Sequence, residues 1–251
     1  MVTVGPMDTQ TLLDTACPLI GKMGSAYYFV PATGAKGKEL GLGGMEFYVL
    51  GRGGPMGDCD GAAVASAFGY FKPAYLAGVW NEAKSKCSPR KAGAAHLEAC
   101  AEHGRTKLSG VANLAGVVAA LDKVNDAADR DGLALYAAIA AEPLASDAPG
   151  RALQLIAVLR EFRGSAHLVA LRAVGLASPV AHAAKRPDMW KVFGYGEEEP
   201  PTIDDAVKAK LAEAEKLTDR MVEPAYAVLS DAERTTLVEG LRAIDAALSA
   251  E

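Results

Sequence analysis

Hydrophobic residues recur at intervals of three and four positions along most of this chain, and that spacing restricts it to a helical fold. The pattern is clear over residues 12–23, 114–124 and 153–159, and again over 203–221 and 237–248. Residues at these intervals line one face of an amphipathic helix, which must pack against other helices to bury that face. We therefore predict a mainly α fold, a multi-helix bundle with very little strand.

Short polar and proline signals mark where several of these helices begin and end. Ser88, followed by proline, is typical of the N-cap of a helix, which we expect to end near Gly104. Gly164 predicts the end of the helix that contains residues 153–159, and Ser165 predicts the N-cap of the next one. Residues 230–233 read Ser-Asp-Ala-Glu, a capping box that begins a final helix.

The first 83 residues combine a glycine-dense stretch with most of the aromatic side chains. Residues 34–61 hold ten glycines, which favour tight turns, and residues 45–50 among them fit a short strand or a short helix. The aromatic side chains form either a hydrophobic core or the walls of a ligand pocket, in which tyrosine hydroxyls orient a small molecule. The candidate pocket residues are Tyr28, Tyr48, Phe68, Tyr70 and Trp80.

Arg52 lies in the glycine-rich run GRGGPMG at 51–57 and is the candidate polar contact of this pocket. The run lacks the spacing of a P-loop, and no clear strand–helix unit surrounds it. An arginine held in such a loop can still bind a carboxylate or phosphate through two parallel hydrogen bonds. The alternatives are a buried structural ion pair and a surface position.

His167 is the candidate catalytic base, with Arg163 close to it in the sequence as an anion-stabilising partner. We expect His167 near a helix N-terminus, where a neutral imidazole is favoured and can act as base or donor. His96, Cys100 and His103 have the only metal-like spacing, and a surface or satisfied role is favoured for them because no acidic residue lies at a convincing ligand spacing beside them. The sequence therefore predicts no metal site, and it specifies no cofactor.

Charge is unevenly distributed along the chain. The formal net charge is −5, and residues 197–251 hold 14 acidic and 6 basic side chains. The segment Lys84–Lys107 is locally basic, which indicates a solvated helix face or a weak site for nucleic-acid phosphates. Glu197, Glu198 and Glu199, followed by two prolines, predict an acidic loop.

Three features of the sequence indicate the cellular compartment of the protein. No apolar run is long enough to cross a membrane, and residues 1–15 lack the pattern of a signal peptide. None of the four cysteines belongs to a C-x-x-C pair, so we interpret them as reduced thiols. We expect a cytoplasmic protein without a membrane partner.

Several motifs, taken in order, resemble an actinobacterial family described as helix-turn-helix or MarR-like. The motifs are YFVP at 28–31, YVLGRGGPMG at 48–57, AFGYFKP at 67–73 and LREFRGSAH at 159–167, together with Trp80 and the pair Thr218-Asp219. The last long motif is similar to L-R-E-H-R-G-D-G-H of the family. The chain departs from the family pattern at Ala32, Phe162 and Ser165, and its recognition-helix and wing region is short.

The resemblance implies a MarR-like bundle with three segments. Residues 1–83 would form the aromatic and glycine-rich pocket, 84–201 a helical core with the acidic linker, and 202–251 a dimerisation arm, so we expect a homodimer. The favoured hypothesis is a small-molecule-binding protein whose DNA-reading element has degenerated. The alternatives are a transcriptional regulator that binds DNA, and an enzyme with His167 as general base and Arg52 or Arg163 stabilising an anion.

Overall fold

The computed structural model describes residues 7–196 and 198–250, and all regular structure in these ranges is helical. The mainly α prediction is therefore confirmed. Residues 1–6 of the predicted pocket segment and Glu197 of the predicted acidic loop lie outside the described residues. The elements are α1 (Thr9–Met23), α2 (Pro31–Glu39), α3 (Gly44–Gly53), η1 (Gly54–Met56), α4 (Gly61–Phe68), α5 (Pro73–Lys86), α6 (Pro89–Leu108), α7 (Leu114–Ala127), α8 (Ala134–Ile139), α9 (Ala148–Ala173), α10 (Ser178–Lys185), η2 (Pro187–Met189), η3 (Lys191–Tyr195), α11 (Asp205–Ala227) and α12 (Asp231–Ser249).

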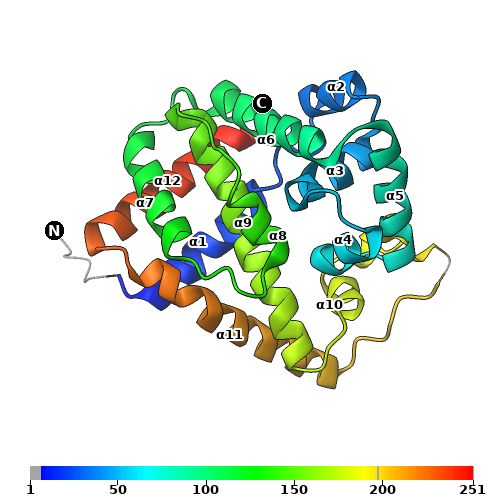
Figure 1. The fold of residues 1–251 in the computed structure, drawn as a ribbon. Helices are drawn as coiled ribbons and strands as arrows, with labels where there is room; N and C mark the ends of the chain where they lie inside the picture. The colour runs from blue at the N-terminus through cyan, green and yellow to red at the C-terminus, as the bar shows by residue number, and fades with distance from the viewer. Residues whose placement is uncertain (1–6, 197, 251) are drawn as a thin grey trace.

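Helix α9 is the central element of the fold (Figure 1). On one side it packs against α1, α7 and α11, and α12 contacts α1 and α7 in turn. Helices α2 to α5 form a second group on the other side (Figure 1), which α6 joins to α9 through its contacts with α2 and α3. Because α9 borders both groups, its side chains can reach the space between them.

The three segments predicted from the sequence share one hydrophobic core. Trp80 of α5, Phe162 of α9 and Tyr226 of α11 are fully buried members of a single cluster of apolar side chains. Helices α11 and α12 pack onto α1, α7 and α9 of the same chain. Their apolar stripes, which suggested a dimerisation arm, are thus covered in part within one chain, although Met221 of α11 stays exposed. The homodimer and the segment boundaries stay predictions.

The predicted helix break at Gly164 and Ser165 is wrong, because α9 continues through both residues to Ala173. A glycine inside a helix costs roughly 1 kcal/mol relative to alanine, which is a weak signal to stop. The apolar residues on either side of it, including Phe162 and Ala166, are buried in the core, and this packing outweighs the glycine. Asp147 caps the helix by accepting a hydrogen bond of 2.9 Å from the backbone N–H of Gly150.

The predicted end of α6 at Gly104 is also wrong, since the helix runs on to Leu108. A Cβ atom at Gly104 would lie 2.4 Å from the backbone carbonyl oxygen of Pro149. The glycine therefore permits α6 and α9 to approach closely, and it does not terminate a helix. The start of α6 agrees with the prediction, with Ser88 as N-cap and Pro89 as the first helical residue.

The glycine-dense stretch is largely helical. Residues 45–50 belong to α3, which settles the choice between helix and strand left open by the sequence. Gly41 and Gly57 have φ values of +75° and +81° and make the expected tight turns. A Cβ atom at Gly54 would lie 2.1 Å from the carbonyl oxygen of Pro89, so close packing explains another of these glycines.

The predicted capping box at the start of α12 is confirmed. The Glu233 carboxylate accepts hydrogen bonds from the backbone N–H of Ser230, at 2.9 Å, and from its hydroxyl, at 2.8 Å. The described residues between α10 and α11 have only the short turns η2 and η3, as expected for a connecting loop. We call residues 186–196 and 198–204 the strap, because they connect α10 to α11 over the side of the molecule that carries α5 (Figure 1).

Candidate functional site

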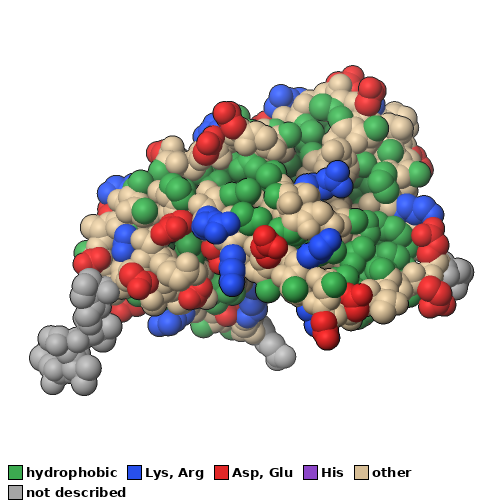
Figure 2. Space-filling view, turned by 90° about the horizontal axis from the view of Figure 1, so that it is seen from below, with side chains coloured by type: hydrophobic (Ala, Val, Ile, Leu, Met, Phe, Trp, Pro, Cys, Tyr) green, Lys and Arg blue, Asp and Glu red, His purple; other side chains and the backbone are tan. Residues whose placement is uncertain are grey.

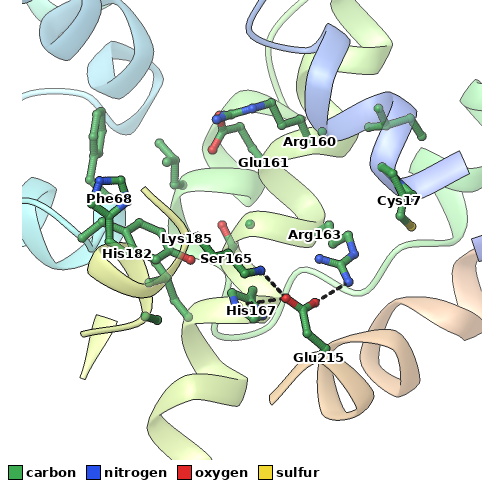
Figure 3. Close-up of a pocket in the computed structure, with 18 of the residues that line it drawn as sticks. Cys17, Phe68, Arg160, Glu161, Arg163, Ser165, His167, His182, Lys185 and Glu215 are labelled. Carbon is green, nitrogen blue, oxygen red and sulfur yellow. Dashed lines mark hydrogen bonds and ion pairs between the residues drawn. The ribbon is translucent and has the colours of Figure 1, made fainter. Parts of the chain in front are cut away.

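A cleft of about 790 Å³ opens between α1, α9, α11, α10, the α3–α4 region and the strap. Figure 3 shows the charged and polar side chains that converge on it, most of them from α9. The lining includes Leu13, Cys17, Ile20 and Gly21 of α1, Tyr48 and Arg52 of α3, Phe68, Tyr70 and Phe71 near the end of α4, Arg160, Glu161, Arg163, Gly164, Ser165 and His167 of α9, His182 and Lys185 of α10, Phe193 of the strap, and Glu215 and Asp219 of α11. The cleft has the size of a small-molecule site.

Arg52 forms a buried ion pair with Glu161 on one wall of the cleft. Nε and Nη2 of Arg52 donate to the two carboxylate oxygens at 2.9 and 2.7 Å, and Nη1 donates to the Tyr48 hydroxyl at 3.1 Å. The side chains of Arg52 and Glu161 are 11% and 4% exposed. The two-bond grip predicted for a ligand carboxylate is thus occupied by the protein's own Glu161, which corrects the interpretation of Arg52 as the ligand clamp.

Two further groups bind the same Glu161 carboxylate. Arg160 Nη1 donates to it at 2.9 Å, and the Tyr28 hydroxyl donates at 3.2 Å. Burial opposes ionisation of this carboxyl, but the positive charges of Arg52 and Arg160 prevail and lower its pKa to about 2. The wall therefore contains an ionised carboxylate held between two arginines.

His167 lies in the interior of α9 and not at a helix start, so the reason that we gave for a neutral ring is wrong. Its Nδ1 lies 2.8 Å from Oγ1 of Thr218, and that hydroxyl donates its own proton to the Ala214 carbonyl at 2.7 Å. The hydroxyl can then only accept from the ring, which places the proton of the neutral imidazole on Nδ1. Burial lowers the pKa of His167 below 6.5, more than Glu215 raises it. A neutral ring with an unprotonated Nε2 follows.

Glu215 is the centre of a second charged cluster on the opposite wall (Figure 3). Arg163 Nη2 donates to its Oε2 at 2.9 Å, and Lys185 pairs with its Oε1. Burial opposes ionisation, but the hydrogen bonds from Lys185 and Arg163 lower the pKa of Glu215 to about 2. Arg163 also donates to Asp219 at 2.9 Å, so both oxygens of Glu215 and one nitrogen of Arg163 have partners in the protein.

Of the aromatic residues predicted for a pocket, Tyr48, Phe68 and Tyr70 line the cleft. Tyr28 lies behind this wall, with its hydroxyl bound to Glu161. Trp80 is fully buried, and its indole N–H donates to the Cys59 carbonyl at 2.9 Å, so its assignment to the pocket is corrected to a core role.

Tyr70 has an uncommon backbone conformation, with φ of +61°. Its N–H donates to the Ser178 hydroxyl at 3.1 Å, and its carbonyl accepts from the Tyr195 hydroxyl at 3.1 Å. A bulky residue with positive φ is strained, and such strain often accompanies functional sites.

The sequence-based assignment missed residues that come from distant parts of the chain. Phe193 of the strap lines the cleft and stacks on Phe71 at 4.0 Å and on His182 at 3.9 Å between ring centroids. Glu161 lies within the motif at 159–167 but was not singled out, and Glu215 lies in a long amphipathic helix without any motif. Ordinary helix periodicity gives no signal for either carboxylate.

Three lining residues have a buried polar atom without a hydrogen-bond partner among the described residues: Nε of Arg163, Oγ of Ser165 and Nε2 of His182. Such atoms are rare in proteins because each costs free energy, and a bound molecule is one way to satisfy them. A Cβ atom at Gly21 or Gly164 would meet no heavy atom within 4 Å, so these two glycines leave room in the cleft.

The structure identifies no metal-binding cluster among residues 7–196 and 198–250. His96 is buried, and its Nδ1 lies 3.0 Å from the Tyr27 hydroxyl. Burial lowers the pKa of His96 to about 3.

Most cations of the segment Lys84–Lys107 have acidic partners. Lys84 pairs with Asp58, Lys86 with Glu46 and Glu82, Arg90 with Glu142, and Arg105 with Glu98 and Asp147. On the face in Figure 2, basic and acidic side chains are likewise interspersed among hydrophobic ones. Neither observation gives the uniform positive surface that attracts nucleic-acid phosphates.

None of the helices in the described part of the chain is both long and apolar enough to cross a membrane. Comparison with curated proteins and with solved structures gives no match. A family model described as "Helix-turn-helix family" matches residues 15–199, which include α3 to α10 and most of the cleft. The match extends over more than half of the chain, and this protein therefore belongs to that helix-turn-helix family.

Proposed function

We propose that this protein binds a small organic molecule in the cleft. The observation that carries the proposal is the combination of a cleft of about 790 Å³ with buried polar atoms that have no partner among the described residues. Ligand sites are mostly apolar with a few convergent polar groups, and the aromatic rings of Phe68, Phe71 and Phe193 supply the apolar part. The polar contacts offered to the ligand come from the unpartnered atoms of Arg163, Ser165 and His182, and from His167.

Whether the cleft binds a small molecule can be tested by filling it with a larger side chain. Gly164 lies in the middle of α9 and has open space at its Cβ position, so Gly164→Leu should place a side chain in the cleft without disturbing the helix. Gly78→Leu is the matched control, because Gly78 is an exposed helical glycine that also has no neighbour within 4 Å and does not line the cleft.

The assay is fluorescence titration with 1-anilinonaphthalene-8-sulfonate, combined with native mass spectrometry of the purified chain to detect a retained molecule. We expect the wild type and Gly78→Leu to bind the dye equally and Gly164→Leu to lose binding while unfolding at a similar temperature. Equal dye binding by all three proteins would contradict the proposal.

DNA binding is the second candidate, and the family match is the observation that favours it. Helices α4 and α5 are joined by a four-residue turn that includes Gly69, which resembles the connection of a helix-turn-helix pair. The exposed residues in the first turns of α5 are Pro73, Ala74 and Gly78, which have no side-chain donors for base edges. Retention of double-stranded DNA at low salt, with a steep loss as salt rises, would support this candidate over the first.

A further inference from the structure

The hydrogen-bond chain behind His167 determines what kind of group the cleft can accept. Nδ1 of the ring donates to Thr218, whose hydroxyl donates to the Ala214 carbonyl inside α11. A hydroxyl has one hydrogen, so while Thr218 donates to that carbonyl it can only accept from Nδ1. The ring therefore presents an unprotonated Nε2, which is a hydrogen-bond acceptor.

The groups around the ring keep Nε2 unprotonated. Glu215 is the nearest acid, with Oε1 at 3.9 Å from Nε2, which is beyond hydrogen-bond distance. Its two oxygens already bind Lys185 and Arg163, and Asp219 binds Arg163 as well. Lys185 and Arg163 thus already compensate the two carboxylates that face the ring from α11. Protonation of His167 would add a third positive charge, which these carboxylates would stabilise only weakly.

The aromatic side chains that line the cleft indicate the shape of the ligand. Phe71, Phe193 and His182 form a stack of parallel rings at one end of the cleft, and Tyr70 lies 6.0 Å from His182 between ring centroids. Flat apolar molecules pack well against such surfaces. His167 lines the cleft, and a ligand group that meets its unprotonated Nε2 must be a donor, because two acceptors would repel each other.

We propose that the ligand of the cleft is a flat, largely apolar compound with a weakly acidic hydroxyl, a phenol or an enol, which donates a hydrogen bond to Nε2 of His167. The proposal rests on the cleft being a ligand site. It adds the chemical class of the ligand and the orientation in which it binds. Thr218 is a positioning residue, which acts only by fixing the proton of the ring on Nδ1.

The test uses two compounds with the same aromatic body, 2-naphthol and 2-methoxynaphthalene. Only the first can donate, so the wild type should bind it roughly fivefold to tenfold more tightly, the effect of one net hydrogen bond. His167→Phe keeps an aromatic ring without the acceptor and should bind the two compounds equally. Equal affinities in the wild type would overturn the proposal.

Thr218→Val separates positioning from mere packing. Valine has nearly the shape of threonine but cannot accept from Nδ1, so the proton of the ring should move to Nε2 and the preference for 2-naphthol should disappear. Thr33→Val is the matched control, because Thr33 is a buried threonine of α2 outside the cleft whose hydroxyl has no partner among the described residues. It should leave the preference unchanged.

Nitrogen-15 NMR of the imidazole gives a readout without any ligand. The wild type at pH 7.5 should show His167 protonated on Nδ1 and not on Nε2, and the Nε2–H form would overturn the proposal. The preference for 2-naphthol should persist above the pKa of His167 and disappear below it, as the proton taken up by Nε2 removes the acceptor.

Failure of the inference can be told from failure of the proposed function. If both compounds bind the wild type equally and Gly164→Leu abolishes both, the cleft is a ligand site but His167 does not select a donor. If neither compound binds, the class of ligand inferred here is wrong. The dye titration then decides separately whether the cleft binds small molecules.

Discussion

Replacing Glu161 by glutamine should destabilise the protein strongly, because it leaves Arg52 buried without a counter-charge. The Arg52 side chain is 11% exposed, and both of its hydrogen bonds to Glu161 are shorter than 3 Å. Breaking a buried ion pair from one side costs about 3–5 kcal/mol. The positive charges of Arg52 and Arg160 lower the pKa of Glu161 to about 2, which agrees in direction, because the ionised carboxylate is favoured in the folded chain.

The sign of the pH effect follows from the lowered pKa. A carboxyl with a lower pKa in the folded chain stabilises it above its ordinary pKa of 4.5, and this contribution is lost as pH falls towards about 2. Glu161→Gln has no such group, so its stability should depend less on pH in this window. The difference in free energy of unfolding between wild type and variant should therefore shrink between pH 4.5 and pH 2.

The assay is urea unfolding followed by circular dichroism at pH 7 and at steps down to pH 2. Asp188→Asn is a control, because Asp188 belongs to an exposed ion pair with Arg186 and its loss should hardly move the urea midpoint. The double variant Arg52→Met/Glu161→Leu removes both charges of the pair but leaves Arg160 and the Tyr28 hydroxyl without their acceptor, so it should recover part of the stability lost by Glu161→Gln. A loss below about 1 kcal/mol for Glu161→Gln at pH 7 would refute the argument that this pair is effectively buried.

Three further substitutions test the packing of the helices. Gly164→Ala should raise the melting temperature by roughly 2–4 °C, since alanine favours a helix over glycine by about 1 kcal/mol and the site is open, and a lower melting temperature would contradict this. Gly240→Ala should cost roughly 1–3 kcal/mol in urea unfolding, because its Cβ would lie 2.1 Å from Cγ2 of Val117, and an unchanged midpoint would show that α7 and α12 adjust freely. Asp147→Ala should cost roughly 0.5–2 kcal/mol through loss of the cap of α9, whereas Asp147→Asn should retain most of the stability.

The helical class and most helix positions could be predicted, because the period of apolar residues is a local signal. The failures at Gly104 and Gly164 have one physical cause. Glycine is ambiguous in a sequence, since it can end a helix, permit close approach of a neighbour, or leave space beside a ligand. At Gly104 the neighbour is the Pro149 carbonyl, and at Gly164 no atom lies near. Only the tertiary structure distinguishes these cases.

The candidate site was predicted in part. Arg52, Arg163 and His167 do line one cleft, although 115 positions separate the first from the last. Their partners could not be predicted, because Glu161 lies 109 positions from Arg52, and Glu215 lies 52 positions from Arg163. The alternative that Arg52 forms a buried ion pair proved correct, but the identity of the acid required the fold.

The contact between α1 and α12 has a consequence for how the chain reaches its folded state during synthesis. Helix α1 leaves the ribosome long before α12, yet the surface that the two helices share is complete only when α12 has been made. Thr218 and Glu215, which complete the surroundings of His167, arrive nearly as late, on α11. A nascent chain that has reached only α10 therefore exposes apolar faces of α1 and α9 and lacks one wall of the cleft. Such intermediates are prone to aggregate until the C-terminal helices emerge, and chaperone dependence should be greatest at that stage.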